Sequence, residues 1–354
     1  MIKPKKFTKV GIIGFGAYVP KFRITVEEIA KVYDKDGNSI AASLGVKQKA
    51  VAGIDEDTVS LSVEAATSAL SRVQGKPFKP TDLGAVLVGS ESHPYTVKPS
   101  GSIVAEILGV GHDYLTADLE FACKAGTTAM VIIASLIEAG LIDCGLAIGA
   151  DVAQSRPADA LEYTAGAGAA AIILGSKKYS WLAQFNSVSS YNSDTPDFWR
   201  REGEKYPAHA GRFTGEPAYF NHVITSTKQY LNKFKQKTTN FNHIVLHMPN
   251  GKFPIKAASR LGISREQLAT GFIVPEIGNP YSASAMTGLV KVLEEGRAGD
   301  RVFVTSYGSG AGSDSFSLTI KRKNTFNKEA DIKNQLKDVE QISYTKYSQL
   351  KKVD

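Results

Sequence analysis

The chain has only two cysteines, Cys123 and Cys144, in 354 residues. Two cysteines cannot build a disulfide framework, and their spacing does not match a zinc site. No uninterrupted apolar run approaches the roughly 20 residues that a transmembrane helix needs, and no signal-peptide apolar segment follows Met1. The sequence therefore predicts a cytoplasmic protein with no metal site and no membrane span.

The chain also lacks the patterning of a nucleic-acid-binding protein, although its formal net charge is +7. Lys and Arg are scattered, except in a segment from about Lys321 onward, and no stripe of interleaved basic and aromatic residues accompanies them. We therefore predict no nucleic-acid partner. A basic surface instead suits a small polyanionic ligand, such as a cofactor that carries phosphates.

The remaining composition is that of a folded globular protein, with 43% hydrophobic and 22% charged residues. Runs rich in β-formers alternate with helical patterns, which predicts a layered α/β fold. The predicted strands cover 9–15, 85–88, 117–122, 146–148, 169–174, 181–188, 243–247, 301–306 and 315–320. The predicted helices cover 124–139, 218–234, 255–261 and 284–293.

The length favours two fused half-domains. Each half has a strand that ends in a polar cluster, a helix that begins with small residues and a glycine-rich pair of strands. We predict an N-terminal half at 1–175, a C-terminal half at 176–322 and a charged extension at 323–354. The extension is poor in apolar residues, and we interpret it as a solvated appendage.

Cys123 stands where a predicted strand passes into a helix of small residues, in the motif FACKAG. The positive end of that helix is expected to lower the pKa of the thiol, which suits a covalent nucleophile. A buried structural cysteine is equally compatible with the pattern. Cys144 enters an apolar strand and fits the structural interpretation better.

His247 and Glu91 each follow an apolar strand, at the edge where open α/β sheets collect catalytic groups. A partly buried carboxylate at Glu91 would have a raised pKa and could take a proton from the carbon next to a thioester, although an ordinary loop carboxylate explains the pattern more simply. Asn279 precedes a helix, where it caps the helix or donates a hydrogen bond to a thioester oxygen. The loop Gly308–Gly310 lacks the spacing of a phosphate-binding loop and is predicted to offer backbone N–H groups to an oxyanion.

Taken in order, these motifs resemble the thiolase superfamily, and most closely its archaeal 3-hydroxy-3-methylglutaryl-CoA synthases. The resemblance spans about residues 9–321. Its most specific stretches begin at Gly89 (GSESHPY), Phe121 (FACKAG), Ser193 (SDTPDFWRREG), Gly211 (GRFTGEPAY), His247 (HMPN), Gly278 (GNPYS) and Ser306 (SYGSG). It implies a thiolase-like α/β fold, in which two pseudo-duplicated βαβαβ-type halves form a five-layered αβαβα architecture.

The resemblance also implies a reaction of the mevalonate pathway of isoprenoid biosynthesis. Cys123 would take the acetyl group of acetyl-CoA, and Glu91 would then remove a proton from the acetyl methyl group. His247 would polarise and protonate the ketone of acetoacetyl-CoA, and hydrolysis would release 3-hydroxy-3-methylglutaryl-CoA. The implied substrate-binding residues are Asn279, Tyr281, Ser306, Gly308, Ser309, Lys252, Lys256 and Thr214.

Coenzyme A thioesters are the implied substrates, and no permanently bound cofactor is expected. The implied assembly is a homodimer or a dimer of dimers, in complex with an acetoacetyl-CoA thiolase and a small OB-fold protein. The segment 194–219 is predicted to contact a partner or to cover the substrate pocket.

Two alternative functions stay open at this point, and a third, a biosynthetic thiolase, is disfavoured on chemical grounds. A biosynthetic thiolase would need a second cysteine in the late glycine-rich loop, where this chain has Tyr307-Gly-Ser-Gly. An initiating ketoacyl synthase uses Cys, His and Asn, which Cys123, His247 and Asn279 supply, but it decarboxylates a malonyl thioester and needs no glutamate base. A catalytically silent scaffold of the same fold is the non-enzymatic alternative. Glu91 discriminates between the ketoacyl synthase and the 3-hydroxy-3-methylglutaryl-CoA synthase, because only the latter needs a glutamate base.

Overall fold

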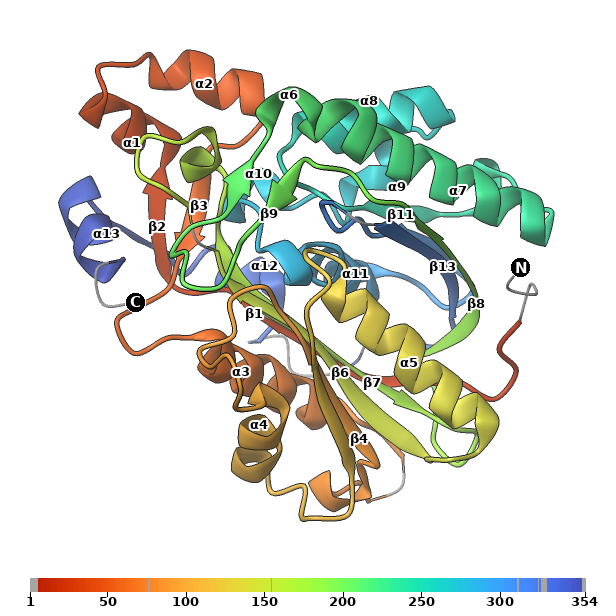
Figure 1. Ribbon diagram of the computed structural model, residues 1–354. Helices are drawn as coiled ribbons and strands as arrows, with labels where there is room; N and C mark the ends of the chain where they lie inside the picture. Colours follow the sequence, from red (N-terminus) through yellow and green to blue (C-terminus); the bar gives the residue numbers. More distant parts are fainter. Residues whose placement is uncertain are drawn as a thin grey trace.

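One nine-stranded mixed sheet runs through the computed structural model, which describes residues 6–75, 77–153, 155–310, 312–323, 325 and 330–351 (Figure 1). The strand order is β11-β12-β13-β8-β1-β7-β6-β4-β5. The strands are β1 (Gly11–Tyr18), β4 (Ala85–Gly89), β5 (Leu115–Leu119), β6 (Cys144–Val152), β7 (Ala167–Gly175), β8 (Ala183–Asn192), β11 (His243–Leu246), β12 (Arg301–Thr305) and β13 (Gly312–Ile320).

The two halves of this sheet repeat one pairing pattern. In the first half β4 is parallel to β6, which is antiparallel to β7, and β7 is antiparallel to β1. The second half repeats this pattern: β11 is parallel to β12, which is antiparallel to β13, and β13 is antiparallel to β8. The halves join where β1 pairs with β8 over two residue pairs. The α/β fold with duplicated halves is therefore confirmed, while the boundaries proposed at 175/176 and 322/323 stay predictions.

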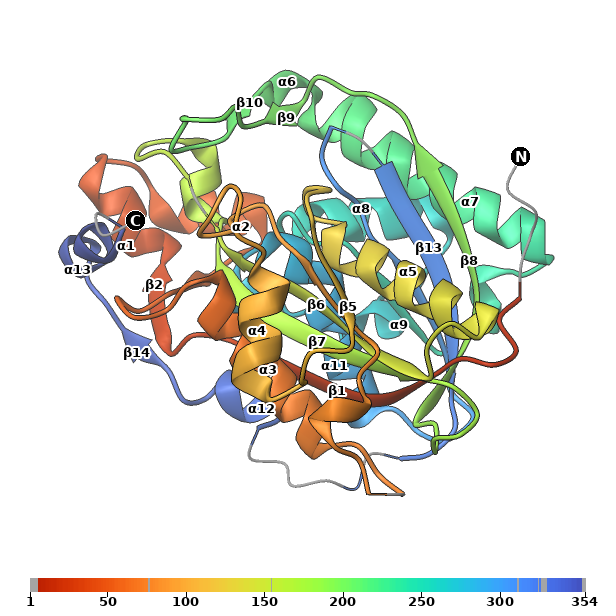
Figure 2. The same ribbon diagram turned by 60° about the horizontal axis from the view of Figure 1, so that its bottom comes forward.

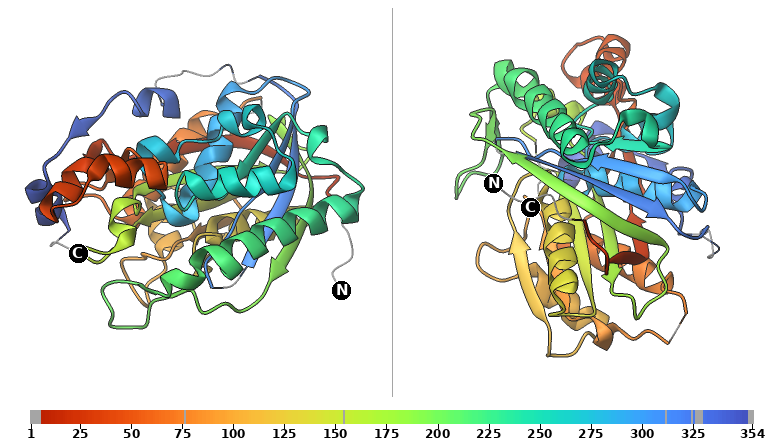
Figure 3. Two further views of the ribbon diagram at one scale, coloured as in Figure 1. Left: turned by 90° about the horizontal axis from the view of Figure 1, so that it is seen from above. Right: turned by 90° about the vertical axis from the view of Figure 1, so that its right-hand side faces the viewer.

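Helices form layers on both sides of each half of the sheet (Figures 1 and 2). The inner layer consists of α5 (Ala125–Ala139) and α11 (Ser284–Glu295). Helices α3 (Thr58–Ser71) and α4 (Ser100–Leu108) cover the outer face of the first half. The second half is covered by α7 (Phe220–Phe234), α8 (Lys252–Leu261) and α9 (Arg265–Ala269). In Figure 3, α7 and α5 lie on opposite sides of β8 and β13.

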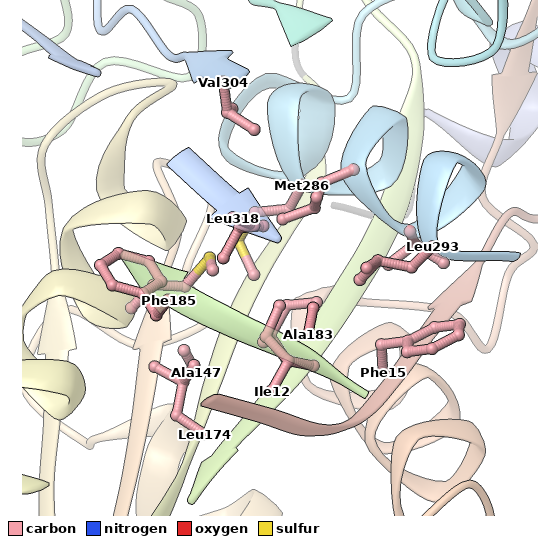
Figure 4. Packing of buried hydrophobic residues seen from close by; sticks show 14 of the residues in the cluster. Ile12, Phe15, Ala147, Leu174, Ala183, Phe185, Met286, Leu293, Val304 and Leu318 are labelled. Atoms are coloured by element: carbon pink, nitrogen blue, oxygen red, sulfur yellow. The ribbon is translucent and has the colours of Figure 1, made fainter. Parts of the chain in front are cut away.

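The largest hydrophobic core lies where the two halves meet. Figure 4 shows Ile12 and Phe185 from the two half-sheets packed near Met286 of α11. Gly126 of α5 allows the close approach of the inner helices, because a Cβ atom there would lie 2.5 Å from the sulfur of Met286. The small-residue start of this helix is therefore a packing requirement.

The segment Ala122–Ala139, which includes α5, is long and apolar enough to cross a membrane by length and composition alone. In the structure 56% of it is buried, and α5 packs between the two half-sheets. Its apolar character is therefore explained by the protein core.

The predicted helices and strands are confirmed in position, with ends that shift by a few residues. The sequence patterns did not predict the small sheet that β2 (Phe22–Thr25), β3 (Gln48–Val51) and β14 (Glu340–Gln341) form. The other elements without a prediction are α1 (Val26–Val32), α2 (Gly37–Leu44), α3, α4, β9 (Phe198–Trp199), β10 (Ala208–His209), α6 (Gly211–Phe213), α9, α10 (Val274–Ile277), α12 (Ile332–Gln335) and α13 (Tyr344–Leu350).

The interpretation of the C-terminal extension as a solvated appendage is wrong for residues 330–351. Ile332 is fully buried, and Tyr347 and Leu350 pack into the core that also contains residues of β2, β3 and α1. The buried guanidinium of Arg72 in the turn after α3 lies 3.0 Å from a carboxylate oxygen of Asp331. The extension is therefore part of the folded body.

Candidate active site

Cys123 lies in a tight turn between β5 and α5. The predicted strand 117–122 ends earlier, at Leu119, because the chain turns at Ala122, whose φ of 44° is in the left-handed region. Such a conformation costs energy in a residue with a side chain and is typical of active-site turns. The turn leaves Cys123 only 3% exposed, two residues before the helix begins.

Glu91 and Cys123 are in direct contact. Because β4 and β5 are parallel neighbours, the segments that follow them meet at one edge of the sheet. The thiol of Cys123 donates a hydrogen bond to Glu91 Oε1 at an Sγ–O distance of 3.2 Å. The structure thus brings together two residues that lie 32 positions apart in the sequence.

A second, fully buried carboxylate lies beneath Glu91. Asp151, at the end of β6, accepts hydrogen bonds from the hydroxyls of Ser90 and Ser92 and from the backbone N–H groups of Glu91 and Ser282, at 2.7–2.9 Å. Burial, together with the charge of Asp151, raises the pKa of Glu91 well above its usual range. Glu91 is therefore a stronger base than an ordinary glutamate.

The expectation that the helix end lowers the pKa of Cys123 is wrong. Burial of the thiol, followed by the nearby charge of Glu91, raises the pKa of Cys123 well above its usual range. A backbone hydrogen bond from Ser309 acts in the opposite direction but does not outweigh these causes. The thiol is therefore protonated at neutral pH and depends on a neighbouring base for activation.

This pKa leads to a prediction for alkylation. In the wild-type protein the rate at which iodoacetamide modifies Cys123 should stay low at neutral pH and rise only under strongly alkaline conditions, since burial and the charge of Glu91 raise the pKa of the thiol. Glu91→Gln removes the negative charge that disfavours the thiolate, so the same profile should shift to lower pH. Peptide mapping separates the Cys123 signal from the Cys144 signal, and Cys123→Ser serves as the blank. An unchanged pH profile in Glu91→Gln would contradict the assignment of Glu91 as the charge that raises the pKa of Cys123.

The glycine-rich loop presents one backbone amide to Cys123. The N–H of Gly308 donates to the carbonyl of Gly312 at 2.8 Å, and the N–H of Gly310 donates to Asp197 Oδ1 at 2.9 Å. The N–H of Ser309 donates to the sulfur of Cys123. Of the predicted loop Gly308–Gly310, Ser309 therefore offers the N–H group that is suited to an oxyanion.

Asp197 holds this loop in place, and sequence reasoning did not single it out. Its buried carboxylate also accepts hydrogen bonds from Thr195 Oγ1 at 2.8 Å and from the hydroxyl of Tyr307 at 3.1 Å. Asp197 lies in the stretch SDTPDFWRREG that carries the family resemblance, but the polar segment has no periodicity that would assign Asp197 this role.

His247 follows β11, as predicted, and is 1% exposed. Burial lowers the pKa of His247 to about 3, so its imidazole is neutral at physiological pH. Its ring centroid lies 6.0 Å from that of Tyr307, and Tyr219 donates to its backbone carbonyl at 2.8 Å. Within the described part of the chain Nδ1 is buried without a hydrogen-bond partner.

Tyr281 packs against Cys123, whereas Ser306 is not among the residues that line the cleft. Asn279 Oδ1 accepts from the backbone N–H of Tyr281 at 3.0 Å, but Asn279 does not cap the helix that follows, because Pro280 and Ala283 occupy the two N-cap positions. Tyr281, whose φ is 45°, packs in a small cluster with Cys123. The hydroxyl of Ser306 is fully buried and accepts from Thr127 Oγ1 at 2.7 Å.

The other predicted contacts lie apart from this group. Lys252 and Lys256 are exposed on α8, and Lys256 Nζ lies 5.2 Å above the ring of Phe220. Thr214 begins a π-helical turn, and its hydroxyl is buried without a partner in the described residues. None of the three lines either cavity beside Glu91 among the residues that the structure places.

An open cleft of about 590 Å³ leads to Glu91. It is lined by Glu91, His93, Pro94, Tyr95, Thr96, Glu120, Ala122, Phe198, Trp199, Arg200, Arg201, Glu202, Gly203 and Ser309. The hairpin of β9 and β10, labelled in Figure 2, supplies one wall, as expected of a segment that covers the pocket. No cluster that could hold a metal ion occurs among the described residues.

Comparison with known proteins connects this site to a family. Residues 231–320 match the model of the C-terminal domain of 3-oxoacyl-[acyl-carrier-protein] synthase III. The chain is 54% identical over 310 residues to the hydroxymethylglutaryl-CoA synthase of Methanocaldococcus jannaschii, which covers 88% of each chain. It is 47% identical over 344 residues to that of Methanosarcina barkeri, which covers 97% of this chain and 98% of the relative.

Solved structures give the same result for the fold. The structure of MvaS in complex with 3-hydroxy-3-methylglutaryl coenzyme A superposes with a TM-score of 0.87 at 25% identity, over 98% of this chain and 92% of the other. The 3-oxoacyl-(acyl carrier protein) synthase III of Pseudomonas aeruginosa gives a TM-score of 0.77 at 21% identity, over 89% and 99% of the two chains.

Proposed function

The chain belongs to the hydroxymethylglutaryl-CoA synthases, and from this premise we propose that Cys123, Glu91 and His247 condense acetyl-CoA with acetoacetyl-CoA and water. The enzyme is an acyltransferase whose products are 3-hydroxy-3-methylglutaryl-CoA and coenzyme A. The observation that carries the proposal is the contact between the Cys123 thiol and the half-buried Glu91 carboxylate.

The first step is transfer of the acetyl group to Cys123. Glu91 Oε1 accepts the thiol proton, and the sulfur attacks the carbonyl carbon of acetyl-CoA. The backbone N–H of Ser309 points at the sulfur and is placed to stabilise the negative charge that develops on the thioester oxygen. Coenzyme A leaves as a thiol with the proton that Glu91 had taken.

The second step forms the carbon–carbon bond. Glu91 removes a proton from the methyl group of acetyl-Cys123, and the carbanion attacks the ketone of acetoacetyl-CoA. His247 is neutral, so it polarises the ketone by a hydrogen bond and hands over its proton only as the alkoxide forms. The proton that Glu91 took from the methyl group then replaces it, so that His247 is neutral and Glu91 is a carboxylate again. Water then cleaves the thioester on Cys123 and releases the product.

Asp197 is proposed to position the Ser309 amide through Gly310 and Tyr307. Asp197→Ala should lower kcat by about 10²–10³-fold, the effect of losing one oxyanion donor, and change KM for acetoacetyl-CoA much less. Asp197→Asn keeps an acceptor for the Gly310 N–H and should restore most of kcat. Steady-state kinetics on both variants, with thermal unfolding as the check on folding, measures this, and equal losses in the two variants would contradict it.

An initiating ketoacyl synthase is the rival enzyme, because the fold is shared. That reaction generates its carbanion by decarboxylation and has no use for a base in contact with the nucleophile. The test supplies acetyl-CoA with either acetoacetyl-CoA or a malonyl thioester and identifies the product by mass spectrometry. We expect 3-hydroxy-3-methylglutaryl-CoA from the first mixture; condensation that requires the malonyl thioester would favour the rival.

A homodimer is proposed from the edge of the sheet. Strand β5 is the outermost strand of the first half, and its outer edge, which pairs with no other strand among the described residues, is a template for pairing with a second copy. Nearby Leu115 is 49%, Tyr95 51% and Val97 92% exposed. Leu115→Glu should therefore yield monomers in light scattering, whereas dimers that persist would place the interface elsewhere.

The remaining expectations stay predictions of the sequence and of the resemblance. They are the complex with an acetoacetyl-CoA thiolase and a small OB-fold protein, the cytoplasmic location, and contacts of Lys252 and Lys256 with coenzyme A phosphates. The exposed positions of both lysines on α8 are compatible with such contacts.

A further inference from the structure

Lys124, the residue after Cys123, forms a buried ion pair that joins the two halves of the fold. Its Nζ lies 3.0 Å from Oδ2 of Asp314, and the two side chains are 4% and 3% exposed. Lys124 is the N-cap residue of α5 in the first half, whereas Asp314 belongs to β13 in the second half. The proposed reaction uses neither charge, so the presence of this pair beside the nucleophile needs a different explanation.

Both members of the pair have further partners that fix their positions. Thr128 links them, because its hydroxyl accepts from Lys124 Nζ at 3.0 Å and donates to Asp314 Oδ2 at 3.2 Å. Ser190 of β8 donates to the other carboxylate oxygen, Oδ1, at 2.6 Å. Lys124 Nζ also lies 3.9 Å from the ring centroid of Phe121, within the range of a cation–π interaction. These contacts hold the two charged groups in one defined arrangement.

Each end of the pair adjoins a part of the active site. Cys123 directly precedes Lys124 in the turn before α5. Strand β13 begins at the glycine-rich loop, where Gly308 and Gly312 exchange two backbone hydrogen bonds at 2.8 and 3.1 Å. A Cβ atom at Gly308 would lie 2.6 Å from the carbonyl oxygen of Phe121 and 3.1 Å from Cγ of Lys124. The backbone of the loop therefore lies directly against the turn and against the Lys124 side chain.

An ion pair at this place is informative because it is not the most stabilising way to hold two halves together. Two apolar side chains of similar volume often stabilise a buried contact as well as a salt bridge does, or better. A charged hydrogen-bonded pair adds a short, directional contact between its two groups. Here that contact ties the turn that carries Cys123 to the strand after the loop of Ser309, whose N–H donates to the Cys123 sulfur.

We propose that Lys124 and Asp314 are positioning residues that set the distance between Cys123 and the Ser309 N–H group. The inference rests on the proposed function, because it concerns the step in which that N–H stabilises negative charge on the thioester oxygen. In this role neither side chain contacts the substrate or exchanges a proton. A displacement of about 1 Å in such a site can lower a rate by about 10²-fold, so the alignment of the two halves affects the rate of acetyl transfer.

The test removes both charges together, since removing one leaves the other buried without its partner. In Lys124→Met/Asp314→Asn the rate constant for acetylation of Cys123 at saturating acetyl-CoA, measured by rapid quench and mass spectrometry, should fall about 10–100-fold. The acetyl-CoA concentration that gives half the maximal rate should change much less. Thermal unfolding checks folding. Asp314→Asn alone keeps the shape of the carboxylate, should lose about as much rate as the double variant because the pair acts as one unit, and replaces the double variant if that does not fold.

A second measurement reports on the hydrogen bond from Ser309 itself. Enzyme acetylated with acetyl-CoA that carries carbon-13 in its acetyl carbonyl group gives a separate C=O stretching band in infrared difference spectra. A hydrogen bond to the carbonyl oxygen lowers the frequency of this band. The band of the acetylated double variant should therefore lie at higher frequency than that of the wild type, whereas an ion pair that only stabilises the fold would leave the frequency unchanged.

Lys291 provides the matched control, because it is another buried lysine in an ion pair, with Glu295 on α11, and it does not line the cleft. Lys291→Met should leave the acetylation rate constant and the C=O frequency close to their wild-type values. A wild-type enzyme that forms no acetyl-Cys123 overturns the proposed function itself. Wild-type acetylation in the folded double variant, an unchanged C=O band, or an equal loss of rate in Lys291→Met overturns only the role of the ion pair.

Discussion

Replacing Cys123 by alanine is expected to lower the rate of 3-hydroxy-3-methylglutaryl-CoA formation by about 10⁴-fold or more, because covalent transfer of the acetyl group has no other acceptor. The side chain packs against Tyr281 and Ala165, and alanine removes the sulfur without adding volume. The fold should therefore persist. Free coenzyme A release and product formation, measured with both substrates, report the loss.

Cys144 provides the matched control for this variant. It is the other cysteine of the chain, is fully buried in β6, and its thiol lies 2.9 Å from the carbonyl oxygen of Asp82. Cys144→Ala should retain the catalytic rate even if it lowers stability. Substantial activity in Cys123→Ala, or its loss in Cys144→Ala alone, would contradict the assignment of the nucleophile.

Replacing Glu91 by glutamine is expected to lower the condensation rate by about 10²–10⁴-fold, the usual contribution of a general base. Glutamine keeps the size of the side chain but cannot accept the proton of the acetyl methyl group. Acetylation of Cys123 should be slower, because Glu91 no longer accepts the thiol proton, but it should still occur, because removing the Glu91 charge favours the thiolate. The enzyme should therefore stop at the acetylated state.

This partial reaction distinguishes Glu91 from a structural carboxylate. Acetyl-enzyme should be detectable by mass spectrometry in Glu91→Gln, and added acetoacetyl-CoA should not discharge it. Thermal unfolding checks whether Glu91→Gln disturbs the structure around Asp151. The disturbance should be small, because glutamine keeps the backbone N–H that donates to Asp151. Normal condensation in this variant would refute the role of Glu91 as base.

Much of the fold and the position of the central residues could be predicted from local patterns. Glu91 and His247 each follow a short apolar strand, and the strands β4 and β11 lie where the patterns placed them. The general rule that segments after neighbouring parallel strands meet explains why Glu91 lies beside Cys123, but it does not explain the place of His247, because β11 lies at the other end of the strand order. The resemblance supplied the pairing of these residues with Cys123.

Other features depend on contacts between distant segments, so local patterns could not predict them. Asp151 lies at the end of β6, which extends beyond the predicted strand 146–148, and nothing local marks it as a partner of Glu91. Asp197 belongs to a polar segment without periodicity. The pKa of Cys123 rises because of burial and Glu91, neither of which is visible in the helix-start motif.

The C-terminal extension illustrates the same limit. Its apolar residues are few, and the hydrophobic pattern of 323–354 is that of a solvated segment. Burial of Ile332 and Tyr347 arises because the extension lies against elements from the first 50 residues, to which it also adds strand β14. Composition counts apolar residues but does not show which surface receives them.

The most direct test of the account is to mix the enzyme with acetyl-CoA alone, quench it with acid and map its peptides by mass spectrometry. The account predicts an acetyl group on the peptide that contains Cys123, which disappears when acetoacetyl-CoA is added before the quench. An enzyme that carries no acetyl group on Cys123, or carries it on Cys144, would contradict the account.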